Sequence, residues 1–243
     1  MKSNLYPTLV AVHTYKGHTW AAPHVNYCEV LFVRKDWLKD TGINPPTAAQ
    51  KAWTWEEFLS VARKMTTGDR WGLTGEISAL SRTGATENAV AMALARHGVQ
   101  YKDEAGNIIF DTPETVKAIK ELADLFLEYK VIPPASPSYL FQEGENLFKA
   151  GKIGMLGGPS SHYAVIQKDF PDVFSQLLIL PFPTGPAGGA NWISPDGIGI
   201  FKGSKNVEMA KEFIKFYLKD ENIRKFAKAT GGLCPTISGN KKI

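Results

Sequence analysis

The stretch CEVLFVRKDWLKDTG, residues 28–42, sets the fold class of the chain. Its first six residues are mostly β-branched, aromatic or otherwise apolar, which predicts a strand. The nine residues that follow suit a short helix ending at Gly42, because glycine readily takes the left-handed conformation found after helices. A strand followed directly by a helix is the repeating unit of α/β proteins.

A second helix is predicted at residues 54–66, TWEEFLSVARKMT. Thr54 and Glu57 have the spacing of a capping box, in which each side chain bonds the backbone N–H of the other residue. Apolar residues at helical spacing predict a face that packs on a core. This face consists of Trp55, Phe58, Leu59, Ala62 and Met65.

The clearest helical pattern lies at residues 111–130. Thr112 is a predicted N-cap, and Pro113 suits the first helical turn because its missing N–H needs no partner there. The predicted core face of this helix consists of Val116, Ile119, Ala123 and Phe126.

Strands and helices alternate along the rest of the chain. Further strands are expected at residues 153–156, 177–180 and 196–201, the second of them as a buried strand, and residues 157–170 are expected to be a loop that enters a helix. Two more helices are expected after residue 206, with a break near Asp220. This alternation predicts an α/β fold with an at least partly parallel sheet.

The composition argues against several classes of protein. The net charge of +4, from 28 basic and 24 acidic residues, is small and dispersed, so no nucleic-acid partner is expected. No apolar run is long enough to span a membrane, and MKSNLYPTLV, residues 1–10, lacks the apolar core of a signal peptide. Cys28 and Cys234 match no metal-binding or redox spacing and are expected to be two small, partly buried thiols, although a disulfide stays open.

The chain carries no motif for catalysis. The nucleophile elbow, the zinc-protease helix, the phosphate-binding loop and the dinucleotide fingerprint are all absent from the sequence. The five histidines are scattered, and surface or capping roles are expected for them. The sequence therefore predicts neither an enzyme, nor a metal site, nor a cofactor.

The order of the motifs resembles the family-1 extracellular solute-binding proteins of ABC importers, the maltodextrin-binding-protein-like group. The matching positions in residues 15–66 are Tyr15, Gly17, Trp20, Pro23, Lys35, Asp36, Gly42, Pro46, Thr54, Trp55, Glu57, Phe58 and Thr66. Residues 139–160, 180–218 and 231–236 are similar to later family segments, in the same order. Ser160 stands where that family often has an aromatic residue.

The resemblance implies a type II periplasmic-binding-protein fold, in which two α/β lobes joined by hinge segments close on a ligand. It implies a carbohydrate ligand, a mono- or oligosaccharide, and delivery to the membrane subunits of an ABC permease. The implied location is periplasmic or extracellular, with the protein either lipid-anchored or secreted.

The resemblance also implies a division of the chain. Residues 1–27 would enter the first hinge crossing, residues 28–183 would form the main lobe, and residues 184–243 would hold the second crossing with elements of the other lobe. The Pro/Gly-rich segment at 181–192 would be that crossing. The second lobe is expected to be largely missing, as in a chain truncated at both ends. The apolar stripe of its helices would then be exposed or paired in a dimer, and it consists of Met209, Phe213, Phe216 and Tyr217.

The resemblance places several residues near a ligand cleft. Aromatic side chains there would stack on sugar faces, and polar groups would bind hydroxyls. The expected ligand-binding residues are Trp20, Asn26, Tyr27, Ser81, Arg82, Gly158, Ser160, His162 and Trp192. Two alternatives stay open: a site for another small polar solute, such as a polyol or phosphate ester, and a carbohydrate-active enzyme domain.

Overall fold

A computed structural model describes residues 4–47, 51–75, 85–100 and 102–240. The chain forms two compact units. The first unit comprises Met1–Cys28, Pro159–Asp169 and Ile193–Ile243, and the second comprises Glu29–Gly158 and Phe170–Trp192. These boundaries differ from the expected division, since residues 159–169 belong to the first unit and residues 184–192 to the second.

The first unit is built from short elements of the N-terminal region and from the C-terminal helices. Its elements are α1 (Pro7–Val12), β1 (Thr14–Tyr15), β2 (His18–Thr19), the first part of β3 (Ala22–Arg34), α7 (His162–Asp169), β7 (Ile193–Ile198), α9 (Val207–Tyr217), α10 (Asp220–Thr230) and α11 (Ile237–Asn240). The two helices predicted after residue 206, with a break near Asp220, are confirmed as α9 and α10.

The second unit combines helices with part of the sheet. Its elements are the rest of β3, α2 (Lys35–Thr41), α3 (Trp55–Met65), β4 (Trp71–Leu73), α4 (Ala85–Arg96), α5 (Pro113–Leu127), the 3₁₀ helix Ser136–Ser138, α6 (Phe141–Lys149), β5 (Ile153–Pro159), α8 (Pro171–Ser175) and β6 (Leu177–Leu180). Strands follow the order β4-β5-β3-β6, and β4 and β5 are parallel, so the predicted partly parallel α/β sheet is confirmed.

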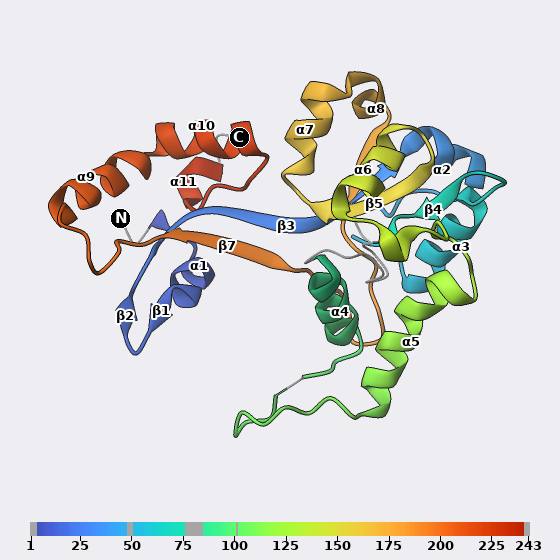
Figure 1. The fold of residues 1–243 in the computed structure, drawn as a ribbon, viewed down its shortest axis with the longest axis horizontal. Coiled ribbons are helices and arrows are strands. Elements are labelled where there is room, and N and C mark those ends of the chain that lie inside the picture. Colours follow the sequence, from blue (N-terminus) through green and yellow to red (C-terminus); the bar gives the residue numbers. More distant parts are fainter. Residues whose placement is uncertain (1–3, 48–50, 76–84, 101, 241–243) are drawn as a thin grey trace. The chain divides into compact units, whose positions relative to one another are not determined.

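The strand predicted at residues 28–33 is part of the much longer β3 (Figure 1). Its first half pairs antiparallel with β7, from Ala22 opposite Ile198 to Cys28 opposite Ile193. Its second half pairs antiparallel with β6, including Leu31 opposite Leu180. One continuous strand therefore supplies backbone to both units.

The capping signals of the second unit are confirmed. Thr54 Oγ1 accepts a hydrogen bond from Glu57 N at 3.2 Å, and the Glu57 carboxylate accepts one from Thr54 N at 2.9 Å. The predicted face of α3 packs on the core: Phe58, Ala62 and Met65 are buried, with Trp55 and Leu59 partly buried beside them. Gly42 ends α2 with φ of 69°, the left-handed conformation that was expected.

The predicted face of α5 is wrong by one position. Thr112 caps the helix as expected, but the buried residues are Thr115, Ala118, Leu122 and Leu125. Val116 is instead 65% exposed. Ala118 and Leu122 pack with Ala93 and Leu94 of α4, so the position of α4 decides which face of α5 is buried.

Two further expectations need correction. The strand at 177–180 exists, but only Leu180 is buried, and Ile179 is 40% exposed, because β6 lies at the edge of the sheet. Residues 157–159 are not loop but the end of β5, and the turn to α7 begins only at Ser160.

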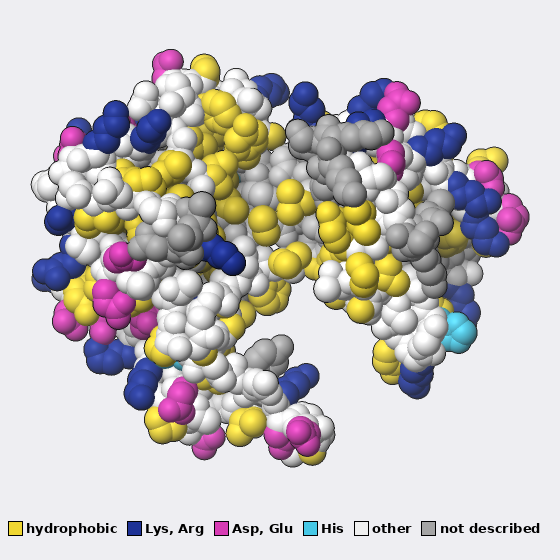
Figure 2. All heavy atoms as spheres, turned by 180° about the vertical axis from the view of Figure 1, so that it is seen from behind, with side chains coloured by type: hydrophobic (Ala, Val, Ile, Leu, Met, Phe, Trp, Pro, Cys, Tyr) yellow, Lys and Arg dark blue, Asp and Glu magenta, His cyan; other side chains and the backbone are white. Residues whose placement is uncertain are grey.

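The surface of α9 is unusual for an amphipathic helix, because none of its residues is buried. Met209, Phe213 and Phe216 are each more than half exposed. Tyr217 differs from this expected open stripe, since it packs beside the small cluster of Leu218, Ile223, Ala227 and Cys234. Figure 2 shows hydrophobic patches on one face of the molecule, where Lys and Arg are scattered among Asp and Glu.

Among the described residues, no helix combines the length and apolar character needed to cross a membrane.

Candidate functional site

The predicted ligand-binding residues fall into both units. The first unit holds Trp20, Asn26, Tyr27, Ser160 and His162. The second unit holds Gly158 and Trp192. Ser81 and Arg82 lie outside the described residues.

The backbone of Asn26 is hydrogen-bonded, whereas its side-chain oxygen has no partner among the described residues. Its N–H donates to Leu233 O at 3.0 Å, and Leu233 N–H donates to Asn26 O at 2.7 Å. The side chain is buried, with the residue 5% exposed, yet Oδ1 accepts no hydrogen bond from a described residue. A buried amide oxygen without a partner costs about 1–3 kcal/mol, so this atom is a candidate for contact with a polar ligand.

Ser160 has the same character. Its N–H donates to Cys28 O at 2.8 Å, which ties the turn before α7 to the strand that carries Asn26. Its Oγ is buried and bonds no described residue. The next helix then starts with His162, which is buried. Two unsatisfied oxygens thus lie on neighbouring, hydrogen-bonded segments of the first unit.

Two glycines that the sequence interpretation missed allow these segments to approach. A Cβ added to Gly231 would lie 2.8 Å from Ser161 Cα and 3.0 Å from Ser160 O. A Cβ on Gly232 would lie 2.3 Å from Val25 Cγ2 and 3.0 Å from Tyr27 Cε1. The distances of 2.8 Å at Gly231 and 2.3 Å at Gly232 are shorter than real Cβ atoms show, so this packing requires glycine at both positions. The signal was present in GGLCPT, residues 231–236, but was used only as a family motif.

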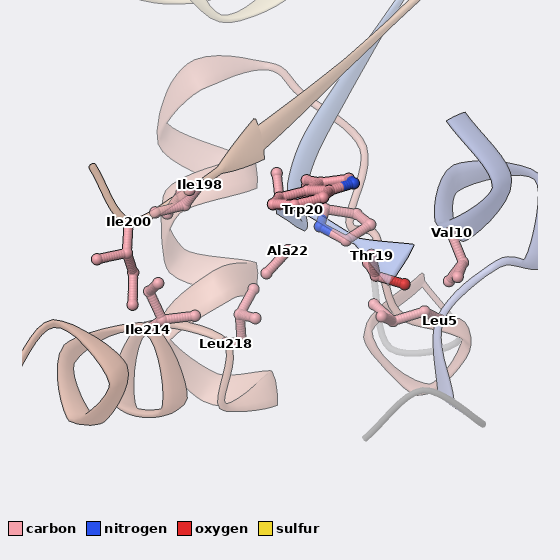
Figure 3. A pocket seen from close by; sticks show the side chains of 12 residues that line it. Leu5, Val10, Thr19, Trp20, Ala22, Ile198, Ile200, Ile214 and Leu218 are labelled. Atoms are coloured by element: carbon pink, nitrogen blue, oxygen red, sulfur yellow. The ribbon is translucent and has the colours of Figure 1, made fainter. Parts of the chain in front are cut away.

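Trp20 lies in a different place from the other predicted residues. It is 67% exposed, and its Nε1 donates to Tyr15 O at 3.2 Å. It lines a pocket of about 380 Å³ that is mostly apolar (Figure 3). The side chains that Figure 3 labels there are Leu5, Val10, Thr19, Trp20, Ala22, Ile198, Ile200, Ile214 and Leu218. None of the other predicted site residues lines this pocket.

The second unit brings Trp192 beside a buried acid. Glu29 N–H donates to Trp192 O at 3.1 Å, and Asn88 Nδ2 donates to Glu29 Oε1 at 3.1 Å. Glu29 is 8% exposed, whereas Trp192 is 38% exposed and offers part of its ring to solvent. Gly158 is buried near the end of β5. The sequence interpretation missed Glu29, although a lone acid inside the apolar run 28–33 was a visible signal.

The titratable groups of the first unit include a half-buried histidine. His24 Nδ1 lies 3.2 Å from the Tyr217 hydroxyl, and its ring also packs near Phe226. Burial lowers the pKa of His24 below its ordinary value of 6.5; nearby Asp196 raises it in part, and His13 lowers it. Through these contacts His24 packs against α9 and α10.

The described residues contain no group of three or more His, Cys, Asp and Glu arranged to hold a metal ion. Cys234 is buried, Cys28 is partly buried, and the two do not form a disulfide, so the expectation of two separate thiols is confirmed. Asn26 and Ser160 offer hydrogen bonding through neutral side chains, and Trp20 and Trp192 offer exposed aromatic surface.

Comparison with known proteins adds a family. The model of the family described as bacterial extracellular solute-binding protein matches residues 5–223. A probable ABC transporter-binding protein of Deinococcus radiodurans is 25% identical over 238 residues, which cover 96% of this chain and 55% of that protein. An arabinooligosaccharide-binding protein of Bacillus subtilis is 24% identical over 77% of this chain and 41% of its own length.

The fold also matches that of solved structures. The structure of maltose-bound T. maritima MalE3 superposes with a TM-score of 0.85 at 23% identity, over 98% of this chain and 60% of that one. This confirms the predicted type II periplasmic-binding-protein fold. The chain spans about half the length of the curated relatives that it matches.

Proposed function

Because the chain belongs to the bacterial extracellular solute-binding protein family, we propose that it is part of the ligand-binding component of an ABC importer and that its ligand is a carbohydrate. The family consists of solute-binding proteins rather than enzymes, in agreement with the expectation from the sequence. The ABC-transporter and arabinooligosaccharide names of two relatives support the importer role and the ligand class.

The observation that carries the proposal is the pair of unsatisfied oxygens, Asn26 Oδ1 and Ser160 Oγ. Sugar hydroxyls both donate and accept hydrogen bonds, so a saccharide can satisfy an amide oxygen and a serine hydroxyl together. Neutral partners also suit a neutral ligand, because no buried charge has to be compensated. A site that is incomplete without its ligand is expected to hold such atoms.

The other predicted residues take supporting roles in this proposal. Trp192 and Tyr27 offer aromatic surface for stacking on a sugar ring. Gly158, at the end of β5, and His162, at the start of α7, keep their predicted roles as ligand-binding residues. Ser81 and Arg82 keep their predicted roles as loop residues that reach the ligand, and Trp20 keeps its role as a further aromatic contact.

The test separates binding from folding. Ser160→Ala removes a buried oxygen that bonds no described residue, so the free energy of unfolding should stay the same or rise by up to about 1 kcal/mol. Saccharide affinity should fall about three- to tenfold, the worth of one hydrogen bond. Asn26→Leu should behave in the same way. Maltose and arabino-oligosaccharides, titrated at millimolar concentration and followed by NMR, supply the affinities.

Ser175→Ala is the matched control, because its hydroxyl is bonded to Asp172 O at 2.8 Å on the surface of the second unit. It should leave binding unchanged. If Ser160→Ala lowered stability and left saccharide binding intact, Ser160 would be a structural residue and the proposal would fail. Binding of a polyol or a phosphate ester in preference to all saccharides would contradict the carbohydrate assignment.

We also propose that a second copy of the chain packs on the exposed face of α9. The exposed side chains Met209, Phe213 and Phe216 form an apolar stripe larger than isolated surface residues explain, and a second copy of the chain would bury it. Sedimentation of the chain should then reveal concentration-dependent dimers that Phe213→Glu abolishes. The matched change Lys211→Glu, on the same helix, should leave the dimer intact.

Periplasmic or extracellular placement follows the family description, and the proposal extends it to a secreted or lipid-anchored protein that delivers its ligand to permease subunits.

A further inference from the structure

A second pocket in the first unit has a different chemistry from the Asn26–Ser160 site. It has a volume of about 510 Å³ and lies between α7 and α10. Its lining residues are Tyr163, Gln167, Glu221, Arg224, Lys225, Ala227, Lys228, Gly231 and Gly232. This volume falls within the range of small-molecule sites, and all its walls belong to one compact unit.

The charge of this pocket is positive. Lys225 forms an ion pair with Glu221 at 2.8 Å, one turn apart on α10. Arg224 and Lys228, also one turn apart, form no ion pair with any described residue. Arg224 does lie close enough to Glu221 to help lower the pKa of that carboxyl. The lining therefore holds three cations and one carboxylate, and like charges one helical turn apart are mildly destabilising unless an anion lies between them.

The guanidinium of Arg224 is oriented for a ligand. Its Nε donates to Asp220 O at 3.0 Å, which holds the side chain along the helix, and the residue is half-buried. The two terminal nitrogens make no hydrogen bond to a described residue, so they can donate in parallel to the two oxygens of one anionic group. Lys228 adds a point charge one turn further along the helix.

The opposite wall is polar and uncharged. Tyr163 and Gln167 lie one turn apart on α7 and offer a hydroxyl and an amide, and Tyr163 is 38% exposed. The floor, formed by Ala227, Gly231 and Gly232, has no bulky side chain to fill the space. We infer that this pocket binds a small oxyanion-bearing ligand, a carboxylate or a phosphate, held by Arg224 and Lys228, with its neutral part against Tyr163 and Gln167.

Titration calorimetry in low-salt buffer tests this inference with two probes, inorganic phosphate and D-glucuronate, and with D-glucose as the uncharged control. Phosphate is expected to bind saturably at one site. Arg224→Gln should weaken it at least about tenfold, because a charge-assisted bidentate contact is lost. Lys228→Gln should weaken it severalfold, and this exposed residue can be changed without risk to the fold. Lys211→Gln, which removes the same charge from α9, should have no effect.

The two probes distinguish the source of the oxyanion. Glucuronate binding at the same site would assign a carboxylated sugar, whereas phosphate binding alone would assign a free or esterified phosphate. Absence of saturable binding, or equal weakening by Lys211→Gln, would overturn the inference. Ser160→Ala should leave phosphate binding unchanged, so failure here and failure of the proposed saccharide site are separate results.

Discussion

Helices α3 and α9 have the same length, eleven residues, and both carry an apolar face, but only the face of α3 holds fully buried residues. In the second unit, α3 buries Phe58, Val61, Ala62 and Met65. In the first unit, α9 buries nothing and holds Phe213 at 56% exposure. Amphipathic spacing therefore tells which face of a helix needs a partner, and it does not tell whether the chain supplies one.

The largest expected effect comes from one substitution made in both helices. Phe58→Ala should lower the free energy of unfolding by about 3–5 kcal/mol, because it empties a fully buried position. Phe213→Ala should change it by no more than about 0.5 kcal/mol, since that ring is exposed. Urea unfolding at low protein concentration measures both. Equal losses would mean that α9 is covered after all.

A glycine substitution tests whether the first unit is tightly packed away from α9. Gly232→Ala should cost about 1–3 kcal/mol, because its new methyl group would overlap Val25. Gly199→Ala is the control in the same unit: its Cβ would lie 3.5 Å from Trp20 O, an ordinary contact. A stable Gly232→Ala protein would indicate that the whole first unit is loosely packed.

Helices α3 and α9 also differ at their N-termini, because α3 has a side-chain cap and α9 has none. Thr54→Ala removes one side of the capping box of α3 and should cost about 1 kcal/mol. Asn206 precedes α9 without a side-chain capping bond, so Asn206→Ala should cost only a few tenths of that amount. Thermal unfolding followed by circular dichroism gives both values, and a larger loss at Asn206 would contradict the description of α9 as uncapped.

The smallest effect concerns pH. Burial lowers the pKa of His24 in the folded chain, so the unfolded chain binds the proton more readily. The free energy of unfolding should therefore have its full value above about pH 6.5, the ordinary pKa of histidine. It should decrease as the pH falls below 6.5 and through the lowered pKa of the folded chain. His24→Gln should flatten this dependence of the melting temperature between pH 7.5 and 5.5. His18→Gln, at an exposed histidine of the same unit, should preserve it.

Helix caps were predicted from the sequence more accurately than the buried faces of helices and strands. Caps such as Thr54, Thr112 and Gly42 were correct because they depend on residues only a few positions apart. The buried face of α5 was wrong because it depends on contact with α4, which periodicity does not describe. The exposure of β6 was missed for a similar reason, since the same apolar run suits the centre or the edge of a sheet.

In the candidate site, too, the sequence predicted individual residues but not how they pack. Asn26 and Ser160 were predicted as site residues, and the structure joins their segments through one hydrogen bond to Cys28. That their oxygens lack partners is a property of packing, which no spacing encodes. Gly231 and Gly232 were missed because their role depends on segments distant in sequence. Their importance appears only when those segments meet.

The pairing of β3 has a consequence for the time course of folding. Residues 22–34 are synthesised well before their partners in β6 and β7, which follow about 150 residues later. At about 5–20 residues per second, the ribosome takes on the order of ten seconds to deliver them. Throughout that interval the apolar strand lacks these partners for its N–H and C=O groups, so we expect chaperones to bind it during synthesis.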